Sequence, residues 1–152
     1  MTSPRVAVRA IILHEHRLLI VNAYPGGKSD LWCAPGGGVA RGQSLHDNLK
    51  RELYEECGLE IAVGAPCLVK EFHDPGSRFH QVDIYFRAAI TGGQINPDWV
   101  DPAGIVTARR FVCEEELRTL RFKPDSLPEV AWGDAAWGDG PALYDALEPI
   151  VR

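Results

Sequence analysis

The chain of 152 residues lacks several features that mark particular classes of protein. No apolar run is long enough to cross a bilayer, and the first residues carry no uninterrupted apolar stretch with a small-residue cleavage site. The net charge is −5, so there is no basic excess for a nucleic-acid polymer or an anionic membrane to bind. These absences predict a cytoplasmic protein with no membrane partner and no nucleic-acid partner.

Cysteine is also scarce. The four cysteines stand at positions 33, 57, 67 and 113, and no two of them form a CxxC pair. Because a zinc site or a disulfide framework needs closer or paired spacing, we expect these residues to be small hydrophobic side chains in the core. The length suits one domain, which we expect to span residues 1–152, with residues 122–152 as an unassigned C-terminal extension.

Apolar and β-branched runs alternate with turn residues along most of the chain. We expect strands at residues 6–13, 17–24, 31–39, 60–74, 79–90 and 105–112. Weaker helical patterns occupy residues 113–120 and 141–148. The mixture predicts an α+β protein in which a mixed β-sheet is flanked by helices, as in an α/β/α sandwich.

Residues 44–57 carry the strongest helical pattern. An apolar residue stands at every fourth position from Leu45 to Cys57, which places all of them in one stripe. Ser44 can cap the start of this helix, and Gly58 can supply a left-handed residue at its end. We therefore predict a helix with one face buried in the core.

Three glutamates, Glu52, Glu55 and Glu56, lie close together on this helix. At about 100° per residue, Glu56 falls within the edge of the apolar stripe, and the other two flank it. Ionised carboxylates at a partly buried edge repel one another and lose hydration, so a positive partner is expected. Arg51 can pair with one of them, or a divalent cation such as Mg²⁺ or Mn²⁺ can take all three. A purely structural acidic helix is the remaining interpretation.

The stretch from Gly37 to Leu59, GGVARGQSLHDNLKRELYEECGL, resembles the signature of the Nudix (MutT-like) hydrolase family, Gx5Ex7REUxEExGU, in which U is a bulky aliphatic residue. The matching positions are Gly37, Arg51, Glu52, Leu53, Glu55, Glu56, Gly58 and Leu59. The resemblance implies a Nudix fold and a pyrophosphohydrolase that cleaves a diphosphate bond in a nucleoside diphosphate linked to another group X. It also implies Mg²⁺ or Mn²⁺ as cofactor, a nucleotide-type small molecule as partner, and a homodimer as one assembly open to the chain.

The resemblance further assigns roles to individual residues. The implied metal ligands are the backbone carbonyl of Gly36 and the carboxylates of Glu52, Glu55 and Glu56. Glu52 or Glu55 would also accept a proton from the attacking water, and Arg51 would orient Glu52.

Two positions depart from the family pattern. The seventh signature residue is Gln43 instead of glutamate, although its amide can still hydrogen-bond to Arg51. Many relatives carry a further glutamate where this chain has Thr107 and Ala108, and Asp101 is one nearby acid that could replace it. These departures leave a second interpretation open, that of a catalytically weak or inactive Nudix-fold sensor that binds nucleotides.

Substrate recognition is expected outside the signature. The segment 71–81 offers Arg78, Phe79 and His80, whose guanidinium and rings suit phosphate contact and base stacking. Packing within the loop or the core is the alternative role for the phenylalanine. The sequence does not choose among a nucleoside triphosphate, ADP-ribose, a dinucleoside polyphosphate and a nucleotide sugar.

Overall fold

The computed structural model describes residues 3–23, 29–133 and 141–151. Its main sheet consists of β1 (Arg5–His14), β2 (Arg17–Asn22), β4 (Gly36–Gly38), β5 (Glu60–His73), β6 (His80–Gly92), β7 (Ala108–Val112) and β9 (Leu143–Pro149). Two short strands, β3 (Leu31–Trp32) and β8 (Arg121–Phe122), pair separately. The helices are α1 (Leu45–Cys57), α2 (Glu114–Arg118) and α3 (Leu127–Trp132).

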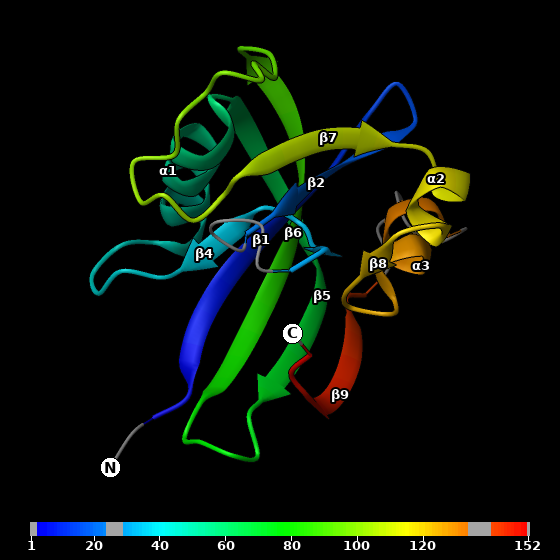
Figure 1. Ribbon diagram of the computed structural model, residues 1–152. Coiled ribbons are helices and arrows are strands. Elements are labelled where there is room, and N and C mark those ends of the chain that lie inside the picture. Colours follow the sequence, from blue (N-terminus) through cyan, green and yellow to red (C-terminus); the bar gives the residue numbers. More distant parts are fainter. Residues whose placement is uncertain (1–2, 24–28, 134–140, 152) are drawn as a thin grey trace.

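The main sheet is mixed, as expected, with the order β7-β2-β1-β6-β5-β9 and with β4 added to β1. β1 runs parallel to β6 and β9 runs parallel to β5, whereas the other pairs are antiparallel. α1 covers one side of this sheet, and α2 and α3 lie on the other (Figure 1). The predicted arrangement of a mixed sheet flanked by helices is therefore confirmed.

Strand β4 is held where β1 has a free edge. β2 pairs with β1 only at Leu13 and His14, and β4 pairs with its earlier part, where Arg9 stands opposite Gly36. The backbone of Gly36 has φ 151°, and a Cβ there would lie 1.9 Å from the carbonyl oxygen of Val8. Only glycine fits this position, and its presence brings residues 36–38, the glycine corner, against the sheet.

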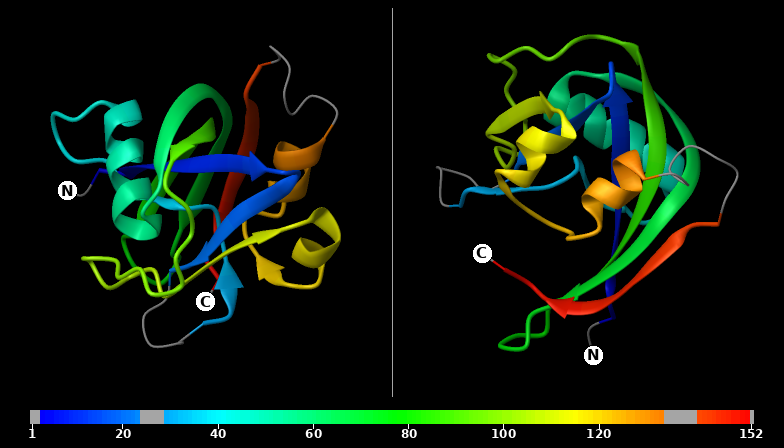
Figure 2. Two further views of the ribbon diagram at one scale, coloured as in Figure 1. Left: turned by 90° about the horizontal axis from the view of Figure 1, so that it is seen from above. Right: turned by 90° about the vertical axis from the view of Figure 1, so that its right-hand side faces the viewer.

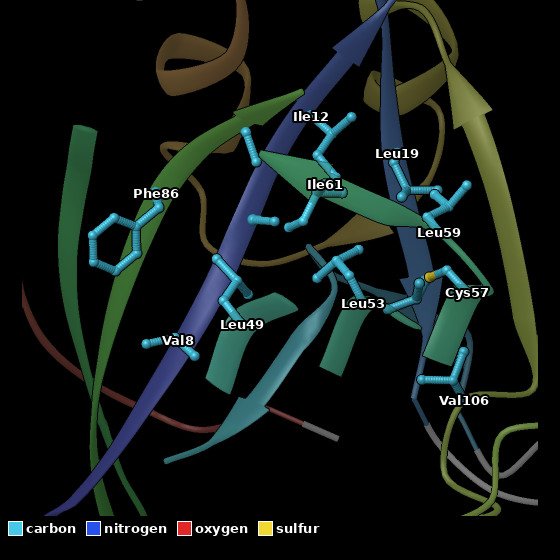
Figure 3. Close-up of a cluster of buried hydrophobic side chains, with 13 residues drawn as sticks. Val8, Ile12, Leu19, Leu49, Leu53, Cys57, Leu59, Ile61, Phe86 and Val106 are labelled. Atoms are coloured by element: carbon cyan, nitrogen blue, oxygen red, sulfur yellow. The ribbon is translucent and has the colours of Figure 1, made fainter. Parts of the chain in front are cut away.

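One hydrophobic core lies between α1 and the sheet. Leu49, Leu53 and Cys57 are fully buried and face side chains from the strands, including Val8 and Leu19 (Figure 3). Burial of each leucine stabilises the fold by roughly 1.5–3 kcal/mol. The apolar stripe therefore fixes α1 with its remaining faces directed away from this core.

A second core fills the other side of the sheet. Ile11 and Tyr85 on the sheet pack with Leu117 of α2 and with Leu127 and Val130 of α3. The four cysteines are unpaired thiols, and those at positions 57 and 67 are buried, as expected. None of the helices in the described part of the chain has both the length and the hydropathy to span a bilayer.

Three details of the C-terminal half and the glycine segment differ from the sequence-based expectation. Residues 141–148 were expected to be helical, but Leu143–Pro149 form strand β9. The strand expected over 31–39 is divided into β3 and β4. Helix α3 was not expected, although Pro128 in its first turn is a recognised start signal. The helical pattern of β9 is overridden because its backbone pairs with β5, a partner remote in sequence.

Candidate active site

Helix α1 begins and ends as its sequence dictates. The Ser44 side chain accepts a hydrogen bond of 3.0 Å from the backbone N–H of Asp47. At the other end, Gly58 is left-handed, with φ 70°, and its N–H bonds the carbonyl of Tyr54. These caps fix the length of the helix that carries the three glutamates.

Arg51 lies among the acidic side chains of α1. Its Nη1 atom is 3.5 Å from Glu52 and 3.2 Å from Glu55. Its Nε atom donates to Gln43 Oε1 at 3.3 Å, and its Nη2 atom donates to Asn48 Oδ1 at 3.0 Å. The guanidinium thus contacts both glutamates, Gln43 and Asn48. The expected contact between Gln43 and Arg51 is present.

Glu56 is the most buried of the three acids, with only 7% of the residue exposed. Its Oε2 atom accepts a hydrogen bond of 3.0 Å from the backbone N–H of Gly36. Burial raises the pKa of Glu56 to about 8, although Arg9 and the Gly36 amide oppose this effect and Glu52 adds to it. The helix therefore places a carboxylate where it is costly to ionise without a nearby cation.

Glu52 rests against the glycine corner. A Cβ at Gly37 would lie 2.8 Å from its carboxyl carbon, so a larger residue at this position would displace the carboxylate. Burial raises the pKa of Glu52, Arg51 opposes the shift, and Glu55 adds to it. The glycine at position 37 therefore provides the space in which this carboxylate lies.

The donor set fits a hard divalent cation. Carboxylate oxygens beside a glycine backbone are the ligands that Mg²⁺ and Mn²⁺ prefer, and two of the acids are destabilised by burial when ionised. Among the described residues no three such side chains already converge as a metal site. Arg51 is paired with Glu52 and Glu55 instead, so binding a cation would require these side chains to reorient.

Asn48 is a supporting residue that the sequence did not single out. This fully buried side chain accepts from the backbone N–H of Ala40 at 2.9 Å and donates to the carbonyl of Gly38 at 3.1 Å. It therefore joins α1 to the segment that leaves the glycine corner. A polar residue one helical turn before Glu52, on the same flank of the apolar stripe, was the signal that could have identified it.

Two further side chains hold the C-terminal end of α1. Trp99 donates from Nε1 to the carbonyl of Glu55 at 2.8 Å, and Arg109 donates from Nε to the carbonyl of Glu56. The last carbonyls of a helix have no partner within it, so these bonds satisfy groups that would otherwise be unpaired. Both contacts act on the backbone of residues that carry the candidate carboxylates.

Asp101, considered above as a replacement for a missing glutamate, lies beside the carboxylates and lines the same cavity. It is 5% exposed. Its carboxylate accepts backbone hydrogen bonds from Ala103, Ile105 and Val106, at 3.0, 3.1 and 2.9 Å. These hydrogen bonds hold the turn at residues 101–106 in place.

The glutamates open into a cavity of about 780 Å³. The residues proposed from the sequence that line it are Gly36, Arg51, Glu52, Glu55, Glu56 and Phe79. Arg78 and His80 do not line it. Arg78 is exposed, and the Nε2 atom of His80 lies 3.8 Å from Oε1 of Glu71. Of the three residues considered for substrate contact, the structure therefore brings Phe79 to the site.

The wall away from α1 is partly apolar and includes two residues of the C-terminal segment that the sequence did not indicate. Phe72, Phe79, Ile150 and Val151 supply apolar surface, and the last two follow β9. β9 runs along β5, and its end lies near the β5–β6 turn (Figure 2). The N–H of Ile150 bonds the carbonyl of His73 at 2.9 Å, which fixes the C-terminal segment at the cavity.

Comparison with known proteins identifies relatives of this chain. A model of the family described as NUDIX domain matches residues 3–133. An ADP-ribose pyrophosphatase of Methanocaldococcus jannaschii is 29% identical over 92 residues, which cover 60% of this chain and 54% of that protein. Diphosphoinositol polyphosphate phosphohydrolase 2 of Rattus norvegicus is 31% identical over 110 residues, which cover 70% and 56%. The chain spans about half the length of the curated relatives it matches.

Solved structures show the same fold. An ADP-ribose pyrophosphatase from Streptococcus suis has a TM-score of 0.70 at 20% identity. The match covers 94% of this chain and 100% of that chain. A UDP-X diphosphatase also has a TM-score of 0.70 at 20% identity, covering 97% and 68%. The family match spans most of the chain and includes the glycine corner and α1. The chain belongs to the NUDIX-domain family.

Proposed function

We propose that the protein is a divalent-metal-dependent pyrophosphohydrolase that cleaves the diphosphate bond of a nucleoside diphosphate linked to a second group X. The observation that carries this proposal is the placement of Glu52, Glu55 and Glu56 in one cavity with the glycine corner of β4. Relatives of the chain are named as a pyrophosphatase and a phosphohydrolase, which supports the same reaction type.

The cavity offers oxygen ligands for a cation. Glu56, Glu52, Glu55 and the carbonyl of Gly36 would hold Mg²⁺ or Mn²⁺. The ion, when bound, would neutralise charge on the diphosphate and lower the pKa of the attacking water. Glu52 or Glu55 would accept the proton of that water, because one carboxylate that is incompletely engaged can act as general base. Arg51, which pairs with both glutamates, would orient Glu52 once these side chains have turned towards the ion.

The charges of the cavity favour a nucleotide over a more highly phosphorylated substrate. Four basic side chains and six acidic side chains line it in the described part of the chain. Three of the basic groups already have acidic partners: Arg9 pairs with Asp83, Arg51 with glutamates of α1, and Lys123 with Asp125. A substrate with many phosphates would need a net excess of positive charge, which the described lining does not have.

The apolar wall suits a base. Phe79 is 38% exposed and lies with Phe72 and Ile150 along the cavity. Stacking of a base on an aromatic ring contributes about 1–3 kcal/mol to binding. We therefore propose that the base lies at this wall and that the diphosphate extends from it towards the carboxylates of α1.

Release of phosphate or nucleoside monophosphate from a substrate panel tests the proposal. The panel contains a nucleoside triphosphate, ADP-ribose, a dinucleoside polyphosphate, a nucleotide sugar and a diphosphoinositol polyphosphate, each assayed with Mg²⁺, Mn²⁺ or EDTA. Metal-dependent turnover of one nucleotide class is expected, with little turnover of the inositol compound. No turnover of any substrate, together with nucleotide binding measured by calorimetry, would instead favour a nucleotide-binding sensor. The bond between Gln43 and Arg51 supports the enzyme over the sensor, because it retains a contact that the substitution of glutamate put in question.

A further inference from the structure

We propose that Arg9, a residue of β1 outside the Nudix signature, binds the diphosphate of the substrate and that Asp83 serves to aim it. The inference rests on the proposed function for the substrate class, and it assigns a role to a strand residue of the same cavity, whose charge also acts on Glu56. Arg9 lines the cavity and stands opposite Gly36 in the pairing of β1 with β4. Its Cα is therefore next to the glycine corner, where the reacting phosphates must lie.

The pairing of β1 with β6 brings three polar side chains together on the strand side of the cavity. β1 and β6 are parallel neighbours, and alternate residues of a strand point to the same face. Arg9 and, from β6, Gln81 and Asp83 share the face that lines the cavity. All three lie on strands, which place side chains more rigidly than a loop does.

Asp83 is a buried structural partner of the arginine. It is 1% exposed, and its Oδ2 atom is 3.2 Å from Arg9 Nε. Its other oxygen, Oδ1, accepts from Gln81 Nε2 at 2.6 Å. With one oxygen on Arg9 and the other on Gln81, Asp83 holds the Nε edge of the guanidinium through a charge-assisted hydrogen bond.

The opposite edge of the guanidinium is also held. Nη1 of Arg9 donates to the carbonyl of Ala34 at 3.0 Å and lies 3.8 Å from Cys33 Sγ. Among the residues that the structure describes, Nη2 has no hydrogen-bond partner, and 18% of the side chain is exposed. A fixed guanidinium with unused N–H donors at a cavity is well suited to bind a phosphate oxygen.

A purely structural role for Arg9 would be balancing the charge of Asp83. That role predicts a loss of stability when Arg9 is replaced, with no preference for phosphate-bearing ligands. Phosphate binding predicts a loss of affinity for a diphosphate ligand even in a variant that remains folded. The two roles are thus separable by measuring stability and affinity on the same proteins.

The test is calorimetric binding of ADP to the full chain in EDTA, which removes any contribution from a metal ion. Arg9→Gln is expected to weaken ADP binding about tenfold or more, the size associated with loss of a charge-assisted hydrogen bond. Arg9→Lys keeps the charge but lacks the planar fork, so a smaller but measurable loss is expected. Asp83→Asn should also weaken binding, because the guanidinium loses its fixed orientation.

Arg110→Gln is the matched control. Arg110 is an exposed arginine on β7, paired with Glu116 and outside the cavity, so ADP should bind this variant as it binds the wild type. Wild-type affinity in a folded Arg9→Gln protein would overturn the proposal, and so would failure of the wild type to bind ADP in EDTA. If Arg9→Gln does not fold, wild-type affinity in Arg9→Lys would do the same. None of these binding measurements requires turnover. A protein that binds ADP through Arg9 but hydrolyses nothing would therefore refute the proposed function and leave the role of Arg9 intact.

Discussion

The two walls of the cavity are built in different ways. The α1 wall gathers its acidic residues from one helix, within five consecutive positions from Glu52 to Glu56. The opposite wall takes Arg9 from β1, Asp83 from β6 and Ile150 from the segment after β9. The helix wall is local in sequence and acidic, whereas the strand wall is assembled from distant segments and is partly apolar.

The difference indicates a division of labour. A carboxylate cluster that is costly to ionise suits the cation and the reaction, and its spacing is fixed by the helical repeat. Aromatic surface and an aimed guanidinium suit recognition, and they depend on which segments the fold brings together. Substitutions in the two walls should therefore change different kinetic parameters.

The largest effect is expected at the helix wall. Glu56→Gln retains an oxygen that can accept the Gly36 N–H but removes the charge needed by the cation. We expect kcat to fall about 10³-fold or more, the equivalent of several kcal/mol of lost transition-state stabilisation. ADP affinity in EDTA should stay near that of the wild type. Steady-state kinetics with Mg²⁺ and calorimetry measure both quantities.

Glu60→Gln, which alters an exposed acid beyond the helix, is the matched control for that experiment. It should leave kcat within the error of the wild type. A fully active Glu56→Gln enzyme would show that the helix wall is not the site of the cation, and the proposed division between the two walls would then fail.

The buried acid should also impose a pH dependence on stability without metal. The pKa of Glu56 is raised from 4.5 to about 8, so the native state holds a proton that the unfolded state has released between these values. Stability should therefore fall as the pH rises from about 4.5 to about 8, by an amount of the order of a few kcal/mol. Urea unfolding in EDTA at several pH values measures the slope.

Glu56→Gln is the comparison for this slope, because it removes the titrating group. The variant should show a smaller loss of stability over the same pH range. In the wild-type protein, Mg²⁺ should raise the stability again near pH 8, because it binds the ionised carboxylate of Glu56. Equal slopes in both proteins would mean that Glu56 is not the group that links stability to pH.

At the strand wall, Phe79→Ala should raise KM about tenfold and leave kcat nearly unchanged, because base stacking contributes about 1–3 kcal/mol to binding. Leu143→Ala is a suitable control, since Leu143 is 41% exposed on β9 and does not line the cavity. An equal loss of kcat and kcat/KM in Phe79→Ala would place this ring in the reaction instead of recognition.

The same contrast explains what the sequence predicted. The helix at 44–57, its caps and its apolar stripe depend on residues within a few positions of one another, and the structure contains all of them. The resemblance to the family added the glycine corner. Local spacing therefore identified the helix and its three glutamates, and the resemblance to the family was needed to make this wall the candidate site for the cation.

The strand wall was not accessible in this way. Ile150 reaches the cavity only because β9 pairs with β5, and the sequence of 141–148 favoured a helix. Arg9 lies within a strand whose apolar neighbours gave no indication of a binding role. Arg78 and His80 were selected for their chemistry, yet the β5–β6 turn directs Phe79 to the cavity without them. Such placements follow from strand register and are not local properties of the sequence.

The smallest expected effect concerns Gln43, the departure from the family signature. Its Oε1 atom already accepts from Arg51 Nε at 3.3 Å, so Gln43→Glu adds charge to an existing contact. Because Arg51 is 37% exposed, the added ion pair should contribute only about 0.2–1 kcal/mol. We expect kcat/KM to be unchanged or to rise by less than about fivefold, measured in parallel with Gln43→Ala, which removes the contact. A large loss of activity in Gln43→Glu would mean that extra negative charge near Arg51 pulls it away from Glu52 and Glu55, so that the helix wall depends on a neutral residue at position 43.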